Sequence, residues 1–322
     1  EYRSSNYWEL GQLFLNRANN DSHEIADRIF SSIKPNFIFM TYTTECFSSS
    51  LYLALHNLAR LKSIAIGLLT TGIAFYAATP NHKIEKRPNS ILEGDYLFAP
   101  SQIDFDHYIF PEIIMRGPFK ELLPFGDPRL AKPFVKKISS YYQNQLNISH
   151  NSSKQISVAV FGTNVPNISD GTQEGQDLVL LNIVKWLAHQ RIPKILVRFH
   201  PQTANTRYRD IIREIEGVET CEHLNSSAVL AVASHVVSPP TSVLCEAMVL
   251  GKPLVVVDDY KPTIKKFADL GVHSVSSSEL RNLKIDDVQS DYSTEQLGPL
   301  IWGKSTEEDC RKKYLEFLTE LI

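Results

Sequence analysis

The sequence of 322 residues is poor in cysteine and has almost no excess of either charge. Four cysteines without a C-x-x-C pair, in a chain too long to need a disulfide framework, predict buried free thiols in a reducing compartment. A net charge of −3 does not suggest the concentrated basic face of a duplex-binding protein, so no nucleic-acid partner is expected. Hydrophobic residues at 43% and charged residues at 21% exclude a disordered or coiled-coil chain. At about 100–200 residues per domain, the length predicts two domains.

Long hydrophobic runs are also scarce, and one stretch needs comment. Residues 63–81 carry no charge, and about 20 apolar residues cross a bilayer. The stretch contains glycines, threonines and a proline, so it favours a buried strand, a turn and a second short segment over a membrane span. We therefore expect a cytoplasmic protein. A peripheral association with the inner face of the membrane or with a complex stays open, as does membership of a larger multidomain chain.

The second half of the sequence alternates strand-like and helix-like runs with short connections. Because the strands are continuously apolar, this order predicts a parallel sheet with helices on both faces. The expected strands are Ser157–Phe161, Lys194–Phe199, His235–Ser238 and Leu254–Val257, and the expected helices are Asp177–His189, Arg207–Glu216, Ser226–Ala233 and Ser242–Leu250.

The front half has a similar but less regular pattern. Its expected helices are Tyr7–Ala18, Ser22–Ile33 and Ser48–Leu61, and its expected strands are Phe37–Thr41, Ile64–Leu69, Tyr96–Ala99 and Glu112–Arg116. The polar stretch 139–154 is predicted to be a linker. The sequence thus predicts an α/β protein with Rossmann-like domains at 1–138 and 155–322.

Ligands of open α/β sheets bind beyond the carboxyl ends of the strands, so the residues that follow each strand are the candidate ligands. Gly162 and Thr163 follow the first strand of the second half, where a glycine and a small hydroxyl let backbone N–H groups approach an anion. Arg198, His200 and Pro201 end or follow the next strand. His200 suits hydrogen bonding to a phosphate or a base edge. Arg198 is either an anion ligand or a cation at the edge of the core.

The stretch from Ser238 to Glu246 is the most informative one. Thr241 or Ser242 is predicted to cap the following helix, whose free N–H groups suit a phosphate. Glu246 lies one turn into this helix on the same face as Ser242, among apolar neighbours. A carboxylate in such surroundings needs a partner, and two ribose hydroxyls would supply one.

These residues resemble the C-terminal domain of GT-B glycosyltransferases. The string from Glu246 to Pro253, EAMVLGKP, followed by LVVVD, is similar to the nucleotide-binding signature of that family, in which the Glu holds the ribose. The resemblance covers roughly residues 155–275. It implies two Rossmann-like domains that face each other across a cleft, with the nucleotide in the second domain.

A second resemblance concerns the donor. The string from Arg198 to Pro201, RFHP, looks like the HP motif of bacterial enzymes that use CMP-activated acid sugars, in which the His contacts CMP. Their paired serines would correspond to Thr241 and Ser242. CDP-glycerol polymerases of teichoic-acid synthesis are similar in this half too. The resemblance implies nucleotide contacts from Gly162, Thr163, Arg198, His200, Pro201, Ser238, Thr241, Ser242 and Glu246.

Catalytic carboxylates are expected from the front domain. Glu45 follows a predicted strand, and Asp104 and Asp106 form a polar cluster near another strand end. One of these groups would serve as base for an acceptor hydroxyl or would attack the sugar. No His or Asp cluster has recognisable metal-ligand spacing, so we expect neither a metal nor a cofactor besides the nucleotide-sugar donor.

The expected activity is transfer of a sugar onto a glycan or glycolipid acceptor in surface polysaccharide synthesis, such as capsule or lipopolysaccharide. The preferred donor is CMP-linked Kdo or sialic acid. A UDP-sugar transferase, a CDP-glycerol-type phosphotransferase and a non-catalytic GT-B-like partner subunit stay open. A UDP-sugar 2-epimerase is disfavoured, because it would need a Gly-Gly pair where this sequence has Pro240-Thr241-Ser242.

Overall fold

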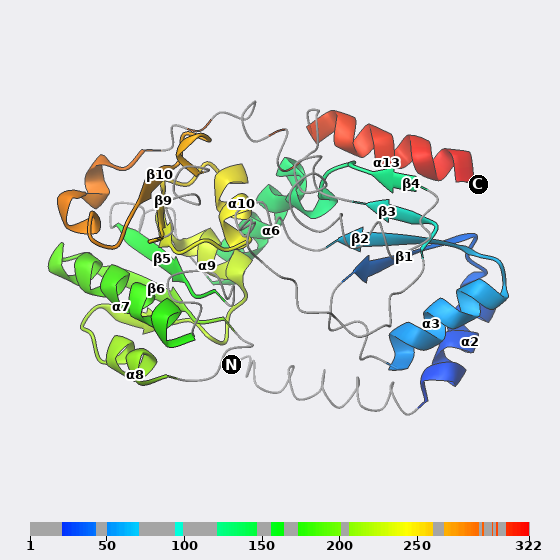
Figure 1. The fold of residues 1–322 in the computed structure, drawn as a ribbon, viewed down its shortest axis with the longest axis horizontal. Coiled ribbons are helices and arrows are strands. Elements are labelled where there is room, and N and C mark those ends of the chain that lie inside the picture. The colour runs from blue at the N-terminus through cyan, green and yellow to red at the C-terminus, as the bar shows by residue number, and fades with distance from the viewer. Residues whose placement is uncertain are drawn as a thin grey trace. The chain divides into compact units, whose positions relative to one another are not determined.

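The chain divides into two compact units in the computed structural model (Figure 1). The structure describes residues 21–42, 50–70, 94–98, 121–146, 156–163, 173–200, 206–259, 267–289, 292, 298, 301 and 307–321. Of these, the first unit contains the residues up to Pro128 and those from Gly298 onward. The second unit contains the described residues from Arg129 to Tyr292. Each unit holds one parallel sheet.

The sheet of the second unit has the strand order β10-β9-β8-β5-β6-β7. Its strands are β5 (Ser157–Phe161), β6 (Lys194–Arg198), β7 (Val218–Thr220), β8 (His235–Ser238), β9 (Leu254–Val257) and β10 (His273–Val275). From β5 the chain moves outward through β6 and β7, then returns to the other side of β5 and continues through β8, β9 and β10. The strand order therefore reverses between β5 and β8, and that pair is the topological switch point.

Helices cover both faces of this sheet. They are α6 (Lys132–Gln145), α7 (Gln173–His189), α8 (Arg207–Arg213), α9 (Ser226–Val232) and α10 (Val243–Val249). Helix α7 packs against β5, β6, β8 and α8, whereas α9 packs against β5, β6, α6 and α10. Because both faces are covered, the strands are apolar along their length, and all four residues of β9 are buried.

Local signals set the ends of these elements. The Asn225 side chain caps α9 by accepting a hydrogen bond from the Ala228 N–H at 2.8 Å. Gly251 follows α10 with φ +69°, in the left-handed region that favours glycine. Lys252 Nζ donates to the Ala233 carbonyl at 2.6 Å and so satisfies the C-terminal end of α9. The GKP turn thus has a structural role of its own.

The first unit has a four-stranded sheet in the order β1-β2-β3-β4. The strands are β1 (Phe37–Tyr42), β2 (Ala65–Thr70), β3 (Tyr96–Phe98) and β4 (Glu121–Leu123), and the helices are α2 (Ser22–Ile33), α3 (Ser50–Leu61) and α13 (Glu307–Leu321). Side chains such as Ile66, Leu68 and Leu97 form one core with Phe30 of α2 and Ala59 of α3. Phe98 and Leu123 form another with Phe317 of α13, and Figure 1 shows α13 alongside β4.

The predicted domain limits differ from the two units. Residues 139–145 of the predicted linker belong to α6, in which Val135 and Ser139 are buried. The Gln143 side chain donates to the Ala231 carbonyl of the second unit at 3.0 Å. The polar composition misled the prediction because much of this helix faces solvent. The boundary lies at Pro128, and α13, expected in the second domain, belongs to the first unit.

The charge-free stretch 63–81 contains β2, as predicted for its first segment. In the described part of the chain, no helix is long and apolar enough to cross a membrane. Cys221, Cys245 and Cys310 are buried, as expected. Burial raises the pKa of the Cys221 thiol to about 11, so this thiol stays protonated and inert near neutral pH. Cys46 and the predicted elements Tyr7–Ala18 and Glu112–Arg116 lie outside the described residues.

Candidate functional site

The switch point between β5 and β8 brings predicted ligands from distant parts of the sequence to one edge of the sheet. Strand β5 ends at Phe161 and β8 ends at Ser238. Ser238 is fully buried, and its hydroxyl lies 3.0 Å from the Phe161 carbonyl and 2.9 Å from the Pro239 carbonyl. The hydroxyl therefore ties the carboxyl ends of the two strands together, which fixes the floor of the site.

Gly162 continues β5 and lies against the chain that leaves β6. Its N–H donates to the Arg198 carbonyl at 2.8 Å. A Cβ at this position would lie 2.9 Å from the backbone nitrogen of His200 and 3.2 Å from Cα of Phe199. Glycine is therefore required by the close approach of two backbones. The next residue, Thr163, is buried, being 3% exposed.

His200 follows β6 and is half-buried at this edge. Burial lowers the pKa of its imidazole, and the positive charges of Arg198 and Arg209 lower it further. The imidazole is therefore neutral near pH 7, with one nitrogen that donates and one that accepts a hydrogen bond. Such a ring suits a base edge or a hydroxyl as well as a phosphate oxygen.

The Arg198 side chain has a definite partner within the protein. Its Nε donates to the carbonyl of Leu224, just before α9, at 2.7 Å. Of the two predicted roles of Arg198, an anion ligand or a cation at the edge of the core, this contact fits the second. Arg198 and Phe199 point to opposite faces of the sheet, as expected for successive residues of a strand. The guanidinium braces the β7–α9 connection and contributes its charge to the environment of His200.

Helix α10 begins close to the predicted place. Ser242 occupies the N-cap position, but its side chain forms no capping hydrogen bond. Thr241 is buried and Ser242 is exposed, so of the two hydroxyls the second is the one open to a ligand. The capping prediction holds for the position and fails for the hydrogen bond, because Ser242 has a helical backbone (φ −60°, ψ −23°) instead of the extended one of a typical cap.

Glu246 lies one turn into α10, and the residues next to it in the helix are buried. Burial raises the pKa of its carboxyl, and a hydrogen bond from the Ser227 side chain partly offsets this effect. Ser227 lies in the first turn of α9, so the carboxylate is held toward the carboxyl edge of the sheet. This partner satisfies part of the hydrogen-bonding capacity of the carboxylate, which has room for about four hydrogen bonds.

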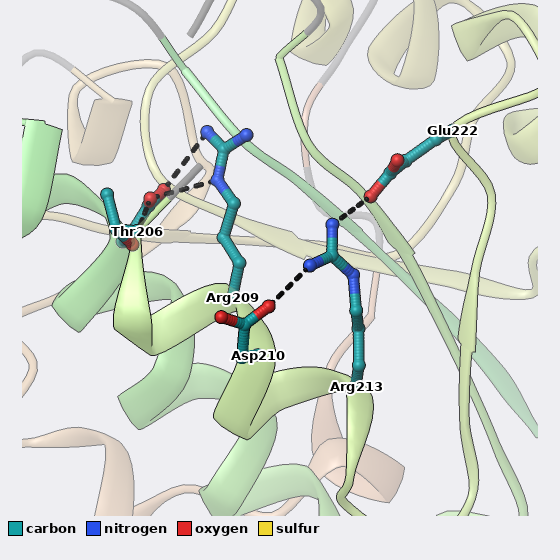
Figure 2. Close-up of polar contacts among 6 residues, drawn as sticks. Thr206, Arg209, Asp210, Arg213 and Glu222 are labelled. Carbon is teal, nitrogen blue, oxygen red and sulfur yellow. Dashed lines mark hydrogen bonds and ion pairs between the residues drawn. The ribbon is translucent and has the colours of Figure 1, made fainter. Parts of the chain in front are cut away.

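A buried ion pair beneath the site was missed by sequence reasoning. Arg209 of α8 is 5% exposed, and Asp177 of α7 is 2% exposed. Arg209 Nε donates to Asp177 Oδ2 at 2.9 Å, and Thr206 Oγ1 donates to the same oxygen at 2.8 Å (Figure 2). The Arg209 guanidinium also lies over the Phe199 ring, 4.7 Å from its centroid.

Pro201, Glu45, Asp104 and Asp106 lie outside the described residues. Among the residues that are described, no group of three or more His, Cys, Asp or Glu side chains could hold a metal ion. Seven predicted site residues lie at the end of a strand or in the segments that follow the strands at the carboxyl edge of the second unit's sheet: Gly162, Thr163, His200, Ser238, Thr241, Ser242 and Glu246.

Replacing Gly162 by alanine is expected to destabilise the second unit by about 1–3 kcal/mol, because the new Cβ would overlap backbone atoms. The same change should weaken ligand binding at this edge, since the chain at His200 must move. Gly251→Ala is the matched control. The new Cβ would strain a residue of positive φ away from this edge, but no atom beyond its chain neighbours lies within 4 Å of it. Thermal unfolding and nucleotide titration of both variants test this prediction. A wild-type unfolding temperature and a wild-type nucleotide affinity in Gly162→Ala would contradict it.

Comparisons with known proteins show a likeness of fold. No known family model matches the sequence, and no curated protein matches it significantly. A solved UDP-GlcNAc 2-epimerase from Neisseria meningitidis, bound to UDP-GlcNAc, is similar with a TM-score of 0.57, 13% identity, and coverage of 95% of this chain and 82% of that one. A 2-epimerase structure from Listeria monocytogenes, described as putative, gives a TM-score of 0.59, 12% identity, and coverage of 95% and 80%.

A variant of the wall teichoic acid polymerase TagF is also similar, with a TM-score of 0.51, 11% identity, and coverage of 100% of this chain and 98% of that one. At these identities the likeness shows the fold alone. The predicted fold class is confirmed: the chain is an α/β protein of GT-B fold with two Rossmann-like units.

Proposed function

We propose that the protein is a GT-B glycosyltransferase whose second unit binds the nucleotide of an activated sugar donor. The observation that carries this proposal is that Gly162, His200 and Glu246 follow the neighbouring strands β5, β6 and β8, which end at one edge of a Rossmann-like sheet, at or next to its switch point. Ligands of such sheets bind at this place. The acceptor would be a glycan or glycolipid of surface polysaccharide synthesis.

Each residue at this edge has a role that fits its surroundings. The neutral imidazole of His200 would hydrogen-bond the base or an oxygen of the donor. Glu246 would accept hydrogen bonds from the ribose hydroxyls. Gly162 and Thr163 would let the backbone approach the phosphate, with the exposed Ser242 hydroxyl as a further donor.

The donor is the finer part of the proposal. The string from Arg198 to Pro201 favours a CMP-linked acid sugar such as Kdo or sialic acid. The likeness to TagF keeps a CDP-glycerol-type donor in consideration, because TagF is named as a teichoic acid polymerase. For catalysis we propose Glu45 or the pair Asp104 and Asp106, without a metal or other cofactor.

A UDP-sugar 2-epimerase is the second candidate, favoured by the solved epimerases that share the fold. Against it stands the sequence Pro240-Thr241-Ser242 in place of a glycine pair. An epimerase needs no acceptor and converts a UDP-sugar into its isomer, whereas a transferase releases the nucleotide when acceptor is present. A non-catalytic partner subunit would do neither.

Calorimetric titration with CMP, CDP, UDP and UDP-GlcNAc tests the nucleotide site and the donor class together. We expect CMP to bind most tightly, and His200→Ala to weaken its binding up to about tenfold through loss of one hydrogen bond. Glu214→Gln, an exposed carboxylate on the same unit, is the control with unchanged affinity. Preference for UDP would overturn the CMP assignment, and absence of binding by all four compounds would overturn the proposed function.

A further inference from the structure

One ion pair contacts both ends of the segment that carries His200. At its start, the ring of Phe199 lies 4.7 Å from the guanidinium carbon of Arg209. At its end, Thr206 Oγ1 donates a hydrogen bond of 2.8 Å to Asp177 Oδ2. Arg209 and Asp177 are paired with each other. The two ends are therefore held by one ion pair, which joins α7 to α8.

The ion pair is almost completely buried, which needs an explanation. Arg209 Nε lies 2.9 Å from Asp177 Oδ2, and Nη2 lies 3.5 Å from Oδ1. The side chains of the two residues are 6% and 3% exposed. Replacing a buried ion pair by apolar side chains of similar volume is often neutral or stabilising, so stability alone does not account for these charges. A role in fixing geometry does account for them.

The chain at His200 is also held by the residue that follows β5. Gly162 leaves so little room that a Cβ there would approach the His200 nitrogen to 2.9 Å. The Phe199 ring faces two guanidinium groups, that of Arg209 and, at 5.3 Å, that of Arg213. Arg213 is itself held by Asp210 and Glu222, as Figure 2 shows. The chain at Phe199 and His200 is thus held through its backbone by Gly162 and through the Phe199 ring by α8.

The charges around His200 fit the same account. Arg198 on β6 and Arg209 on α8 both act on the imidazole and favour its neutral form. Asp177 compensates the charge of Arg209. Removing the pair would therefore alter both the position and the protonation of His200.

We infer that Asp177 and Arg209 are positioning residues, which set the place of His200 in the nucleotide site through their contacts with the adjacent Phe199 and with Thr206. This inference rests on the proposed function for its consequence in binding. It goes beyond that proposal because it assigns a role to two side chains that do not touch the donor.

The test is a mutant cycle in the full chain. Asp177→Asn/Arg209→Met removes both charges and leaves no lone buried ion, and Arg209→Lys keeps the charge without the two-pronged geometry. The double variant should bind CMP about tenfold more weakly than wild type, a loss of about 1.4 kcal/mol. Adding His200→Ala should cause almost no further loss, because the pair acts through His200. Arg209→Lys should fall between the double variant and wild type.

The matched control is a second Arg–Asp pair, in the first unit. Arg60→Met/Asp95→Asn removes the ion pair between Arg60 Nη1 and Asp95 Oδ2, which are 3.3 Å apart. This variant should keep the wild-type affinity for CMP. The inference would be overturned if the losses of CMP affinity caused by His200→Ala and by the Asp177/Arg209 double variant added when combined. Wild-type CMP affinity in the double variant would overturn it as well.

A second readout does not depend on nucleotide. NMR titration of the His200 imidazole in the free protein should show a higher pKa and shifted ring resonances in Asp177→Asn/Arg209→Met, because the charge of Arg209 is gone. Unchanged resonances would overturn the inference even if no nucleotide binds. Failure of the proposed function shows itself separately, as a wild-type protein that binds no nucleotide or a His200→Ala variant that binds as wild type does.

Discussion

Replacing Arg209 by methionine is expected to lower the free energy of unfolding by about 3–5 kcal/mol, the usual cost of removing one partner from a buried ion pair. Asp177 would remain buried, with Thr206 as a neutral donor in place of the cation. The stacking of the guanidinium on Phe199 would be lost as well. Since whole domains are stable by about 5–15 kcal/mol, urea unfolding should show a large fall in midpoint.

The double variant Asp177→Asn/Arg209→Met separates the charge from the packing. It should recover most of the stability, because no lone charge stays buried. Arg213→Met is a useful comparison, because Arg213 lies over the same ring but its ion pairs are more exposed, and its loss should cost about 1 kcal/mol or less. If Arg209→Met unfolds at the wild-type urea midpoint, the account is contradicted, because the buried charge of Asp177 would then not need Arg209 as its partner.

Replacing Glu246 by glutamine is expected to weaken nucleotide binding about 10- to 100-fold, since hydrogen bonds to a charged acceptor contribute about 1.5–3 kcal/mol. Stability should change in the opposite direction. Burial raises the pKa of the Glu246 carboxyl in the folded state, so the folded protein holds this proton more tightly than the unfolded chain does. The ionised carboxylate therefore costs stability at neutral pH, and glutamine removes that cost.

The pH dependence follows from the same sign. The stability gained by Glu246→Gln should be present at pH 7 and should vanish as the pH falls below the ordinary pKa of a glutamate, where both states are protonated. Nucleotide affinity of the wild type should fall as the pH drops through the raised pKa. Thermal unfolding and titration at several pH values measure both effects. A variant that is less stable at pH 7 and binds nucleotide normally would assign Glu246 a structural role.

The elements of the second unit were largely predictable because their signals are local. The runs SVAVF and LVVV are apolar along their whole length, and glycines such as Gly251 follow the helices. Strands β7 (VET) and β10 (HSV) escaped prediction because each has only three residues and neither is an apolar run. Helix α6 was hidden by its polar solvent face.

The site was predictable where it depends on the order of strands and unpredictable where it depends on contacts across the sequence. Residues after strands, such as His200 and Ser238, were found because the carboxyl ends of parallel strands share an edge. The pairing of Asp177 with Arg209 joins residues 32 positions apart, and no local pattern marks it. The contact between Glu246 and Ser227 likewise arises because α9 and α10 pack together.

The central claim is that nucleotide binds at the β5–β8 edge of the second unit, and hydrogen exchange with mass spectrometry tests it directly. On addition of saturating CMP, peptides that cover residues 158–163, 196–200 and 238–246 should gain protection. Peptides of the first unit that cover β2 and α13 should change less. The account would be contradicted if only peptides of the first unit gained protection. It would also be contradicted if calorimetry showed CMP binding and none of the three segments gained protection.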